Sequence, residues 1–322
     1  MKAYVYGADG AAITDVAKPA PKGTQVLVQV RACGLNRADL GMTKGHVHGS
    51  AGGAGTVLGM EWAGEVAEVG PDATGVKLGD KVMGSGAAAF AQFTLADHGR
   101  LFHIPPGMSF EDAATLPVAL TTMHNAVVTN GALQAGQSVL VQGASSGVGL
   151  MALQIAKLKG AKTVIGSSTD AHRRGRLKEF GADLAVDSSD PGWVDQVLKA
   201  TGGEGVDLIV DQVSGKVANQ NLAATRIKGR IVNVGRLGGT RGDFNFDLHA
   251  ARRINYIGVT FRTRSIEEIR DIFSGVRQDI WPAVAAGKLK LPINRTLPFD
   301  AIATAFEHME ANRHLGKIVV TL

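Results

Sequence analysis

Cysteine is nearly absent from this chain of 322 residues, since Cys33 is the only one. A single thiol excludes an internal disulfide and a zinc site built from several thiolates. No apolar run is long enough to cross a bilayer, and the first ten residues, MKAYVYGADG, lack the apolar core of a signal peptide. We therefore expect a cytoplasmic protein that does not insert into a membrane.

Strong charge of one sign is also missing, because the net charge is only +5. The basic residues are nevertheless concentrated, with nine Lys or Arg residues between positions 226 and 264 and only two acids, Asp243 and Asp247. A nucleic-acid groove is one explanation. A solvated surface that attracts an anionic cofactor or substrate is the favoured one, because aromatic residues make up only 5% of the chain and the basic residues are spread over several expected elements. Binding of nucleic acid is not expected.

The first third of the chain has the pattern of a β domain. Short runs rich in Val are bounded by Gly and Pro, and they predict strands at residues 2–6, 24–32, 64–69, 79–82 and 91–95. Many short strands with Gly-rich turns are typical of a small barrel. Residues 41–55 hold six glycines and few apolar side chains, which predicts a mobile loop.

The period changes near residue 110, where Ser109 has the position of a helix N-cap. Expected strands lie at 138–142, 162–166, 183–186, 206–210, 229–234 and 254–260, and expected helices at 147–159, 170–180, 191–200 and 215–224. Alternating strands and helices indicate a parallel sheet covered on both faces. The tail, 316–322, is a further strand that most simply returns to the first domain.

The segment SVLVQGASSGVG, residues 138–149, combines a strand, a tight turn and the start of a helix. Such a turn binds a dinucleotide, because the helix N-terminus presents N–H groups and partial positive charge to a pyrophosphate. Against the G-x-G-x-x-G fingerprint the three positions are Ala144, Ser146 and Gly149, so only the third is glycine. The alternative is an ordinary strand-to-helix turn that binds no dinucleotide. The motifs in the rest of the chain favour the dinucleotide site over this alternative.

The end of the second strand of this unit bears on the choice of cofactor. An NAD enzyme usually carries an acid there, whereas this chain has Ser167. Asp170 follows at the position of a helix cap, and Arg173 and Arg174 come one turn later. A hydroxyl with guanidinium groups nearby suits the additional phosphate of NADPH, which an acid would repel. Two arginines that merely solvate a helix face are the alternative.

Together these motifs resemble the medium-chain dehydrogenase/reductase family, and most of all its zinc-free quinone oxidoreductase (zeta-crystallin-like) branch. The resemblance extends over essentially the whole chain, and its landmarks are GLNRAD at 34–39, GMEWAG at 59–64, GDKV at 79–82, LPVALTT at 116–122, GASSGVG at 143–149 and GK at 316–317. It implies an α/β fold, with a Rossmann doubly wound parallel sheet at 117–289 and a GroES-like β-barrel substrate domain at 1–116 and 290–322. It also implies a homodimer joined through the last Rossmann strand, at about residues 255–261.

The resemblance also bears on metal. Zinc-dependent relatives place a cysteine, a histidine and a second cysteine where this chain has Asn36, Met60 and the neighbourhood of Val118. The lobe that carries four cysteines in many relatives is missing as well. No metal is therefore expected, and without a Lewis acid to stabilise an alkoxide, alcohol oxidation is a poor assignment.

The family pattern assigns roles to particular residues. Asn36, in the vacated metal position, and Thr121, beside the nicotinamide, are the first candidates for chemistry, and His48 takes the place of a family tyrosine. Each could instead be structural: a loop asparagine, a packed helix threonine and an exposed loop histidine. Residues expected at the cofactor are Ser145, Ser146, Gly147, Val148, Gly166, Ser167, Arg173, Gly235, Arg236, Val259, Phe261, Asn312 and Lys317.

The resulting hypothesis is an NADPH-dependent, zinc-independent reductase of quinones or of alkenes conjugated to a carbonyl. Two alternatives stay open. One is a reductase of acidic or CoA-thioester enoyl substrates, which the basic stretch would suit. The other is a crystallin-like protein that binds NADPH or RNA in a structural role without turnover.

Overall fold

The computed structural model describes residues 1–49 and 51–322, and its contacts divide the chain into two units. Unit 1 contains residues 1–119 and 261–322, and unit 2 contains residues 120–260. The contacts thus group residues 261–289 with unit 1, whereas the sequence placed them in the dinucleotide-binding domain. Within the described residues, no helix has the length and hydrophobicity needed to span a bilayer.

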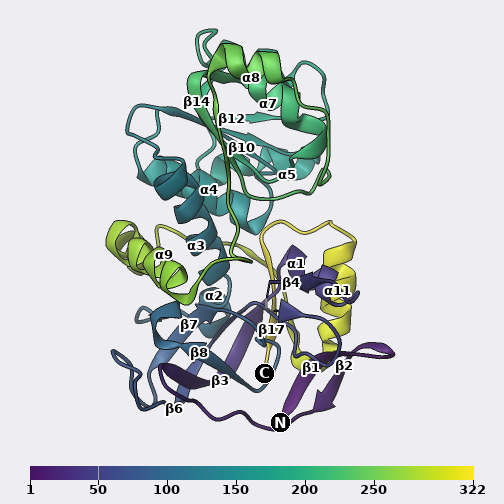
Figure 1. Ribbon diagram of the computed structural model, residues 1–322, viewed down its shortest axis with the longest axis vertical. Helices are drawn as coiled ribbons and strands as arrows, with labels where there is room; N and C mark the ends of the chain where they lie inside the picture. Colours follow the sequence, from purple (N-terminus) through teal and green to yellow (C-terminus); the bar gives the residue numbers. More distant parts are fainter. Residues whose placement is uncertain (50) are drawn as a thin grey trace. The chain divides into compact units, whose positions relative to one another are not determined.

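Unit 1 is built around a seven-stranded sheet in the order β16-β17-β3-β6-β7-β9, with β8 pairing to β3 (Figure 1). Its strands are β1 Lys2–Gly7, β2 Gly10–Asp15, β3 Gln25–Gly34, β4 Val47–His48, β5 Ala51–Gly52, β6 Glu61–Val69, β7 Lys81–Ser85, β8 Phe93–Asp97, β9 Leu101–His103, β16 Ile293–Pro298 and β17 Lys317–Thr321. Its helices are α1 Arg37–Met42, α2 Phe110–Ala113, α9 Ile266–Asp279, α10 Trp281–Ala285 and α11 Ile302–Glu310, while α3 Pro117–His124 crosses into unit 2.

The long strand β3 is the centre of this sheet. Seven of its ten residues are buried, and β17, β6 and β8 all pair with it. Trp62 on β6 and Phe90 anchor the core, and neither is exposed. The predicted return of the tail is confirmed, since Val320 of β17 lies opposite Cys33 of β3.

The segment 41–55 is more regular than its glycine content suggested. Helix α1 ends within it at Met42, and β4 and β5 form a short antiparallel ladder with His48 opposite Ala51. Residue 50 of this segment lies outside the described residues.

Unit 2 is a doubly wound parallel sheet in the order β12-β11-β10-β13-β14-β15, the strand order typical of a Rossmann fold. The predicted fold class is therefore confirmed. Its strands are β10 Ser138–Gln142, β11 Thr163–Ser167, β12 Leu184–Val186, β13 Val206–Asp211, β14 Thr225–Asn233 and β15 Asn255–Gly258. Its helices are α4 Gly147–Leu158, α5 Ala171–Gly175, α6 Trp193–Ala200, α7 Ala218–Ala224 and α8 Phe246–Arg252, with a π-helical segment at Asn125–Asn130.

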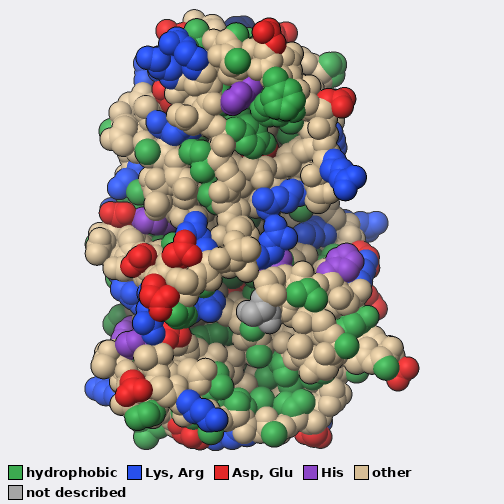
Figure 2. Space-filling view, viewed as in Figure 1, with side chains coloured by type: hydrophobic (Ala, Val, Ile, Leu, Met, Phe, Trp, Pro, Cys, Tyr) green, Lys and Arg blue, Asp and Glu red, His purple; other side chains and the backbone are tan. Residues whose placement is uncertain are grey.

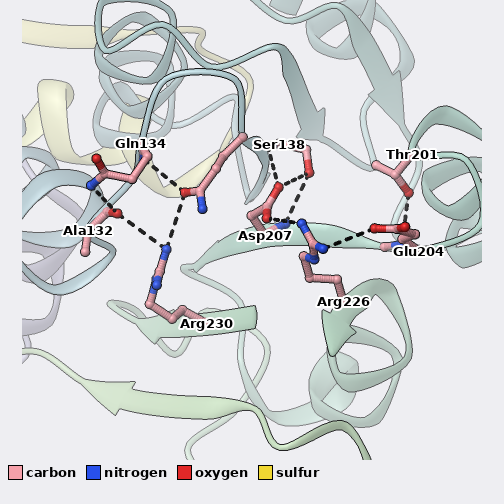
Figure 3. A network of polar contacts seen from close by, with 10 residues as sticks. Ala132, Gln134, Ser138, Thr201, Glu204, Asp207, Arg226 and Arg230 are labelled. Atoms are coloured by element: carbon pink, nitrogen blue, oxygen red, sulfur yellow. Dashed lines mark hydrogen bonds and ion pairs between the residues drawn. The ribbon is translucent and has the colours of Figure 1, made fainter. Parts of the chain in front are cut away.

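Part of the basic stretch is bound to acids at the amino ends of these strands (Figure 3). Asp207 accepts hydrogen bonds from the backbone N–H and the hydroxyl of Ser138, both at 2.8 Å, and from Arg226 at 2.7 Å. Arg226 also pairs with Glu204 at 3.2 Å. This basic side chain is thus neutralised within the sheet, which accounts for part of the charge without an external partner.

Candidate functional site

The turn between β10 and α4 has the form of a pyrophosphate site. Ser146 caps α4, accepting a hydrogen bond from the N–H of Gly149 at 3.1 Å. A Cβ at Gly149 would lie 2.6 Å from the carbonyl oxygen of Gly143, so no other residue fits there without a backbone shift. The N–H groups of Gly147 and Val148, in the first helical turn, have no partner inside the helix and can receive an anion. The residues therefore fit a dinucleotide.

The end of β11 lies beside this turn and is hydrogen-bonded to it. Ser167 is fully buried; its hydroxyl accepts a hydrogen bond from the N–H of Gly143 at 3.0 Å and donates one to Gln142 at 2.6 Å. Gly166 is buried within the same strand. The outer hydroxyl is that of Ser168, which donates to the Ser145 hydroxyl at 3.0 Å. Ser167 thus faces the turn, while Ser145 and Ser168 form its rim.

Helix α5 carries the arginines expected near the adenosine phosphate. Asp170 caps the helix as predicted, accepting the N–H of Arg173 at 2.8 Å, and this hydrogen bond lowers the pKa of its carboxyl. Arg174 is held by Asp187 and by the carbonyl of Ser168, both at 2.9 Å. Arg173 approaches Asp170 only to 3.6 Å. Arg173 remains the residue predicted at the adenosine phosphate.

The carboxyl ends of β13, β14 and β15 bring together other predicted cofactor residues. Gly235 lies so close to β13 that a Cβ would be 2.7 Å from the carbonyl of Gln212, and Val259 continues β15 by donating its N–H to Asn233 at 3.0 Å. Arg236 donates to the carbonyl of Val234 at 3.3 Å. A cavity of about 240 Å³ opens here, lined by Ser214, Asn233, Arg236, Arg241, Phe244 and Tyr256 among others.

In unit 1, the half-buried Asn36 contacts two buried side chains, Glu61 and Lys317. The amide N–H of Asn36 donates to Glu61 at 2.9 Å, and its oxygen accepts from the Lys317 ammonium at 2.9 Å. Lys317 and Glu61 form an ion pair, and the second carboxylate oxygen of Glu61 accepts the N–H of Val118 at 3.0 Å. The charges of the cluster are therefore balanced by the chain itself.

Two further buried groups adjoin this cluster. Asp39 accepts the N–H of Asn36 at 2.7 Å, but its other oxygen has no hydrogen-bond partner among the described residues. Burial raises the pKa of Asp39 to about 7. Cys33 is buried and donates to the carbonyl of Ala89 at 3.0 Å; burial raises the pKa of its thiol.

Zinc does not fit this cluster. Asn36, Met60 and Val118 supply no thiolate or imidazole, and both carboxylate oxygens of Glu61 are occupied by internal donors. Among residues 1–49 and 51–322 there is also no group of three or more His, Cys, Asp or Glu side chains that could hold a metal ion.

The remaining predicted residues are Thr121, His48, Asn312, Phe261 and Lys317. Thr121 is buried in α3, and His48 is half-buried in β4. Asn312 follows α11 and accepts a hydrogen bond from Arg37 at 2.7 Å, and Phe261 begins the second segment of unit 1. Lys317, expected at the cofactor, lies in unit 1 against Asn36. These placements leave the individual roles as predictions.

Several polar residues of the two sites were not singled out from the sequence. Gln142, Asp211, Gln212 and Asn221 are almost wholly buried under the dinucleotide turn. Asp211 and Gln142 each end a buried apolar strand, and polar residues at the carboxyl ends of parallel strands could have marked them. Glu61, which lies in the GMEWAG landmark, forms an ion pair with Lys317.

Comparison with known protein families gives two matches, one within unit 1 and one mainly in unit 2. A model described as an alcohol dehydrogenase GroES-like domain matches residues 22–106, and a model described as a zinc-binding dehydrogenase matches residues 147–275.

Individual relatives include both short and very long proteins. Human quinone oxidoreductase is 28% identical over 314 residues, which are 96% of this chain and 92% of that protein. Erythronolide synthase EryA2 of Saccharopolyspora erythraea is 31% identical over 328 residues, covering 97% of this chain but only 8% of the synthase. Among solved structures, the CurK enoyl reductase superposes with a TM-score of 0.85 at 25% identity, over 99% of both chains.

Proposed function

Since this chain belongs to the medium-chain dehydrogenase/reductase family, whose members are oxidoreductases that use a nicotinamide cofactor, we propose that it is an NADPH-dependent reductase of quinones or of alkenes conjugated to a carbonyl. The observation that carries the proposal is the internally neutralised cluster of Asn36, Glu61 and Lys317, in which Asn36 has the place that the family resemblance gives to a zinc ligand. Without a Lewis acid there, the acceptor must already be electron-poor.

The proposed cofactor site is the turn between β10 and α4, together with the start of α5. NADPH, when bound, supplies the hydride that the acceptor receives. The N–H groups of Gly147 and Val148 would hold the pyrophosphate, and Arg173 the 2′-phosphate. The absence of an acid at Ser167 and Ser168 supports NADPH over NADH, because a carboxylate at this place would bind the 2′-hydroxyl of NADH and repel the phosphate.

The proposed acceptor site includes Asn36, with Thr121 and His48 as further candidates. Asn36 commits one amide N–H to Glu61 at 2.9 Å, whereas its Nδ2 reaches the carbonyl of Gly34 only at 3.4 Å. This weak bond is the one that a substrate carbonyl would replace. His48, on β4, would donate a proton to the reduced product.

The proposal is tested by following NADPH oxidation with a panel of quinones and neutral enones. We expect turnover with at least one of these classes, a lower KM for NADPH than for NADH, and activity that survives treatment with a chelator. No turnover above the blank across the panel, or chelator-sensitive oxidation of simple alcohols, would contradict it.

A second candidate is the reduction of an enoyl thioester. Its support is the similarity to polyketide synthases and to the CurK enoyl reductase, together with Arg236 and Arg241 at the cavity of unit 2, which would attract an anionic substrate. A kcat/KM for an enoyl-CoA well above that for a neutral enone of the same chain length would favour this candidate.

We also propose a homodimer joined along β15. This strand is the edge of the sheet in unit 2. Tyr256 on β15 and Phe246 on α8 are 36% and 75% exposed, and the rings of both pack against Phe244. Figure 2 shows hydrophobic side chains gathered on the surface over α8. An exposed edge strand with apolar side chains needs cover. A monomer mass by light scattering at micromolar concentration would rule the dimer out.

A further inference from the structure

A continuous chain of buried polar groups crosses unit 2 beneath the dinucleotide turn. It begins at Asp211 on β13, passes through Asn221 on α7 to Gln142 on β10, and ends at Ser167 on β11. Asn221 donates to Asp211 at 3.1 Å, Gln142 donates to Asn221 at 2.8 Å, and Ser167 donates to Gln142 at 2.6 Å. None of these four side chains is exposed to solvent.

The direction of every hydrogen bond in this chain is set by Asp211. One oxygen of its carboxylate accepts the N–H groups of Val213 and Ser214 at 2.8 and 2.9 Å, so the other oxygen is left for the amide N–H of Asn221. A carboxylate can only accept, which fixes the orientation of the Asn221 amide. The Asn221 oxygen then faces Gln142 and requires a donor, and the Gln142 oxygen requires one from Ser167.

Ser167, the last of these four polar residues, contacts the dinucleotide turn itself. Because the Ser167 hydroxyl proton is committed to Gln142, its oxygen is free to accept the N–H of Gly143 at 3.0 Å. Gly143 has φ of +71°, a backbone conformation that needs to be held. Gln212 adds a second support, since it donates to the carbonyl of Gln142 at 3.1 Å and accepts from Ser146 at 2.9 Å.

Asp211, at the other end of this series of hydrogen bonds, contacts the loop after β13. Asp211 fixes the N–H of Ser214, a non-glycine residue with φ of +58°, and the Ser214 hydroxyl donates to the carbonyl of Gly235 at 2.6 Å. A strained backbone of this kind persists only where its surroundings hold it. The same buried carboxylate thus supports the turn at β10 and the loops at the ends of β13 and β14.

From this geometry we infer that Asn221, Gln142 and Ser167 are positioning residues, which hold the dinucleotide turn in its binding conformation through hydrogen bonds polarised by Asp211. The inference rests on the proposed function in that the ligand is a nicotinamide dinucleotide. It gives Ser167 a role different from the one that the family resemblance implied: its hydroxyl acts on Gly143 and does not contact the 2′-phosphate.

The test uses Ser167→Ala and Gln142→Met in the full chain, with Gln137→Met as the matched control. Gln137 lies next to the start of β10, outside the polar chain, and its oxygen accepts the N–H of Gln134 at 3.0 Å. Dissociation constants for NADPH and NADH are measured by quenching of nicotinamide fluorescence, at a temperature where circular dichroism shows each variant folded. Unfolding midpoints are recorded separately.

We expect both cofactors to bind more weakly by the same factor, about threefold in Ser167→Ala and about tenfold in Gln142→Met, because the turn binds the pyrophosphate common to both. The control should bind as the wild type does. A Ser167→Ala variant that loses affinity for NADPH alone would show that Ser167 contacts the 2′-phosphate and overturn the inference. Variants that melt earlier but bind both cofactors normally would overturn it too. If the wild type prefers NADH, only the choice of cofactor fails, and the same comparison still tests the positioning role.

Discussion

Lys317 and Glu61 form an ion pair whose side chains are only 6% and 0% exposed, and it joins the last strand of the chain to β6. Replacing Lys317 by Met leaves the Glu61 carboxylate buried beside Asn36 and the N–H of Val118 without its cation. We expect Lys317→Met to lower the free energy of unfolding by about 3–5 kcal/mol, measured by urea denaturation.

The exposed pair of Lys18 and Glu68 provides the control for that change, since both side chains are almost half exposed. Lys18→Met should cost at most about 1 kcal/mol. Adding Glu61→Gln to Lys317→Met should recover part of the loss, because the uncompensated charge is removed. Equal losses for Lys317→Met and Lys18→Met would show that burial adds nothing to the Lys317–Glu61 pair.

Cofactor choice is expected to depend on Arg173. Arg173→Ala removes the guanidinium proposed to meet the 2′-phosphate, and we expect the KM for NADPH to rise about tenfold or more while the KM for NADH stays within about twofold. Arg176→Ala is the control on the same segment, because Arg176 is engaged with Glu179 at 2.8 Å. Steady-state kinetics with both cofactors make the measurement. An equal rise for NADPH and NADH would assign Arg173 to helix stability.

The close approach at Gly149 makes a sharp prediction. In Gly149→Ala the new Cβ would lie 2.6 Å from the carbonyl oxygen of Gly143 and 2.7 Å from the Cα of Ala144, so the turn must shift. We expect dinucleotide affinity to fall at least about tenfold and stability to fall by about 1–3 kcal/mol. In Gly175→Ala nothing lies within 4 Å of the new Cβ, so affinity should be unchanged. Fluorescence titration with NADPH compares the two variants, and normal binding by Gly149→Ala would contradict the tight turn.

Asp39 makes the stability of unit 1 depend on pH. Burial raises its pKa from the usual 3.8 to about 7, so between these values the folded chain holds one proton more than the unfolded chain. The contribution of Asp39 is therefore complete below about pH 4 and is lost as the pH rises through about 7. The side chain in Asp39→Asn cannot ionise. The free energy of unfolding of this variant, relative to that of the wild type, should therefore increase between pH 5 and pH 8. A difference that stays constant over this range would contradict the raised pKa.

Most of the strands and helices of unit 2 could be predicted from the sequence, because each is a local pattern bounded by turn residues. The cap at Asp170 and the glycine at position 149 belong to the same class of short-range signal. Ser167 shows the limit of such local signals. Its position at the end of β11 could be predicted, but its hydrogen bond to Gln142 depends on the pairing of β10 with β11.

The cluster in unit 1 depended even more on contacts between distant residues. Asn36 and Lys317 are 281 residues apart, and only the pairing of β17 with β3 brings them together. The sequence therefore indicated both residues but assigned Lys317 to the cofactor. The family pattern indicated that both residues matter, but only the three-dimensional structure shows that they contact each other.

Strand β17 has a consequence for how the protein is made. Unit 2 is one uninterrupted stretch, whereas unit 1 combines residues 1–119 with residues 261–322, and β17, which pairs with the central β3, comes from the second of these segments. During synthesis from the N-terminus, the Rossmann sheet can close while β3 still lacks this neighbour. Glu61 can therefore pair with Lys317 only after residues 120–260 have been made, so a chain cut between β15 and β17 is expected to keep the Rossmann sheet while its Glu61 carboxylate lacks a cation.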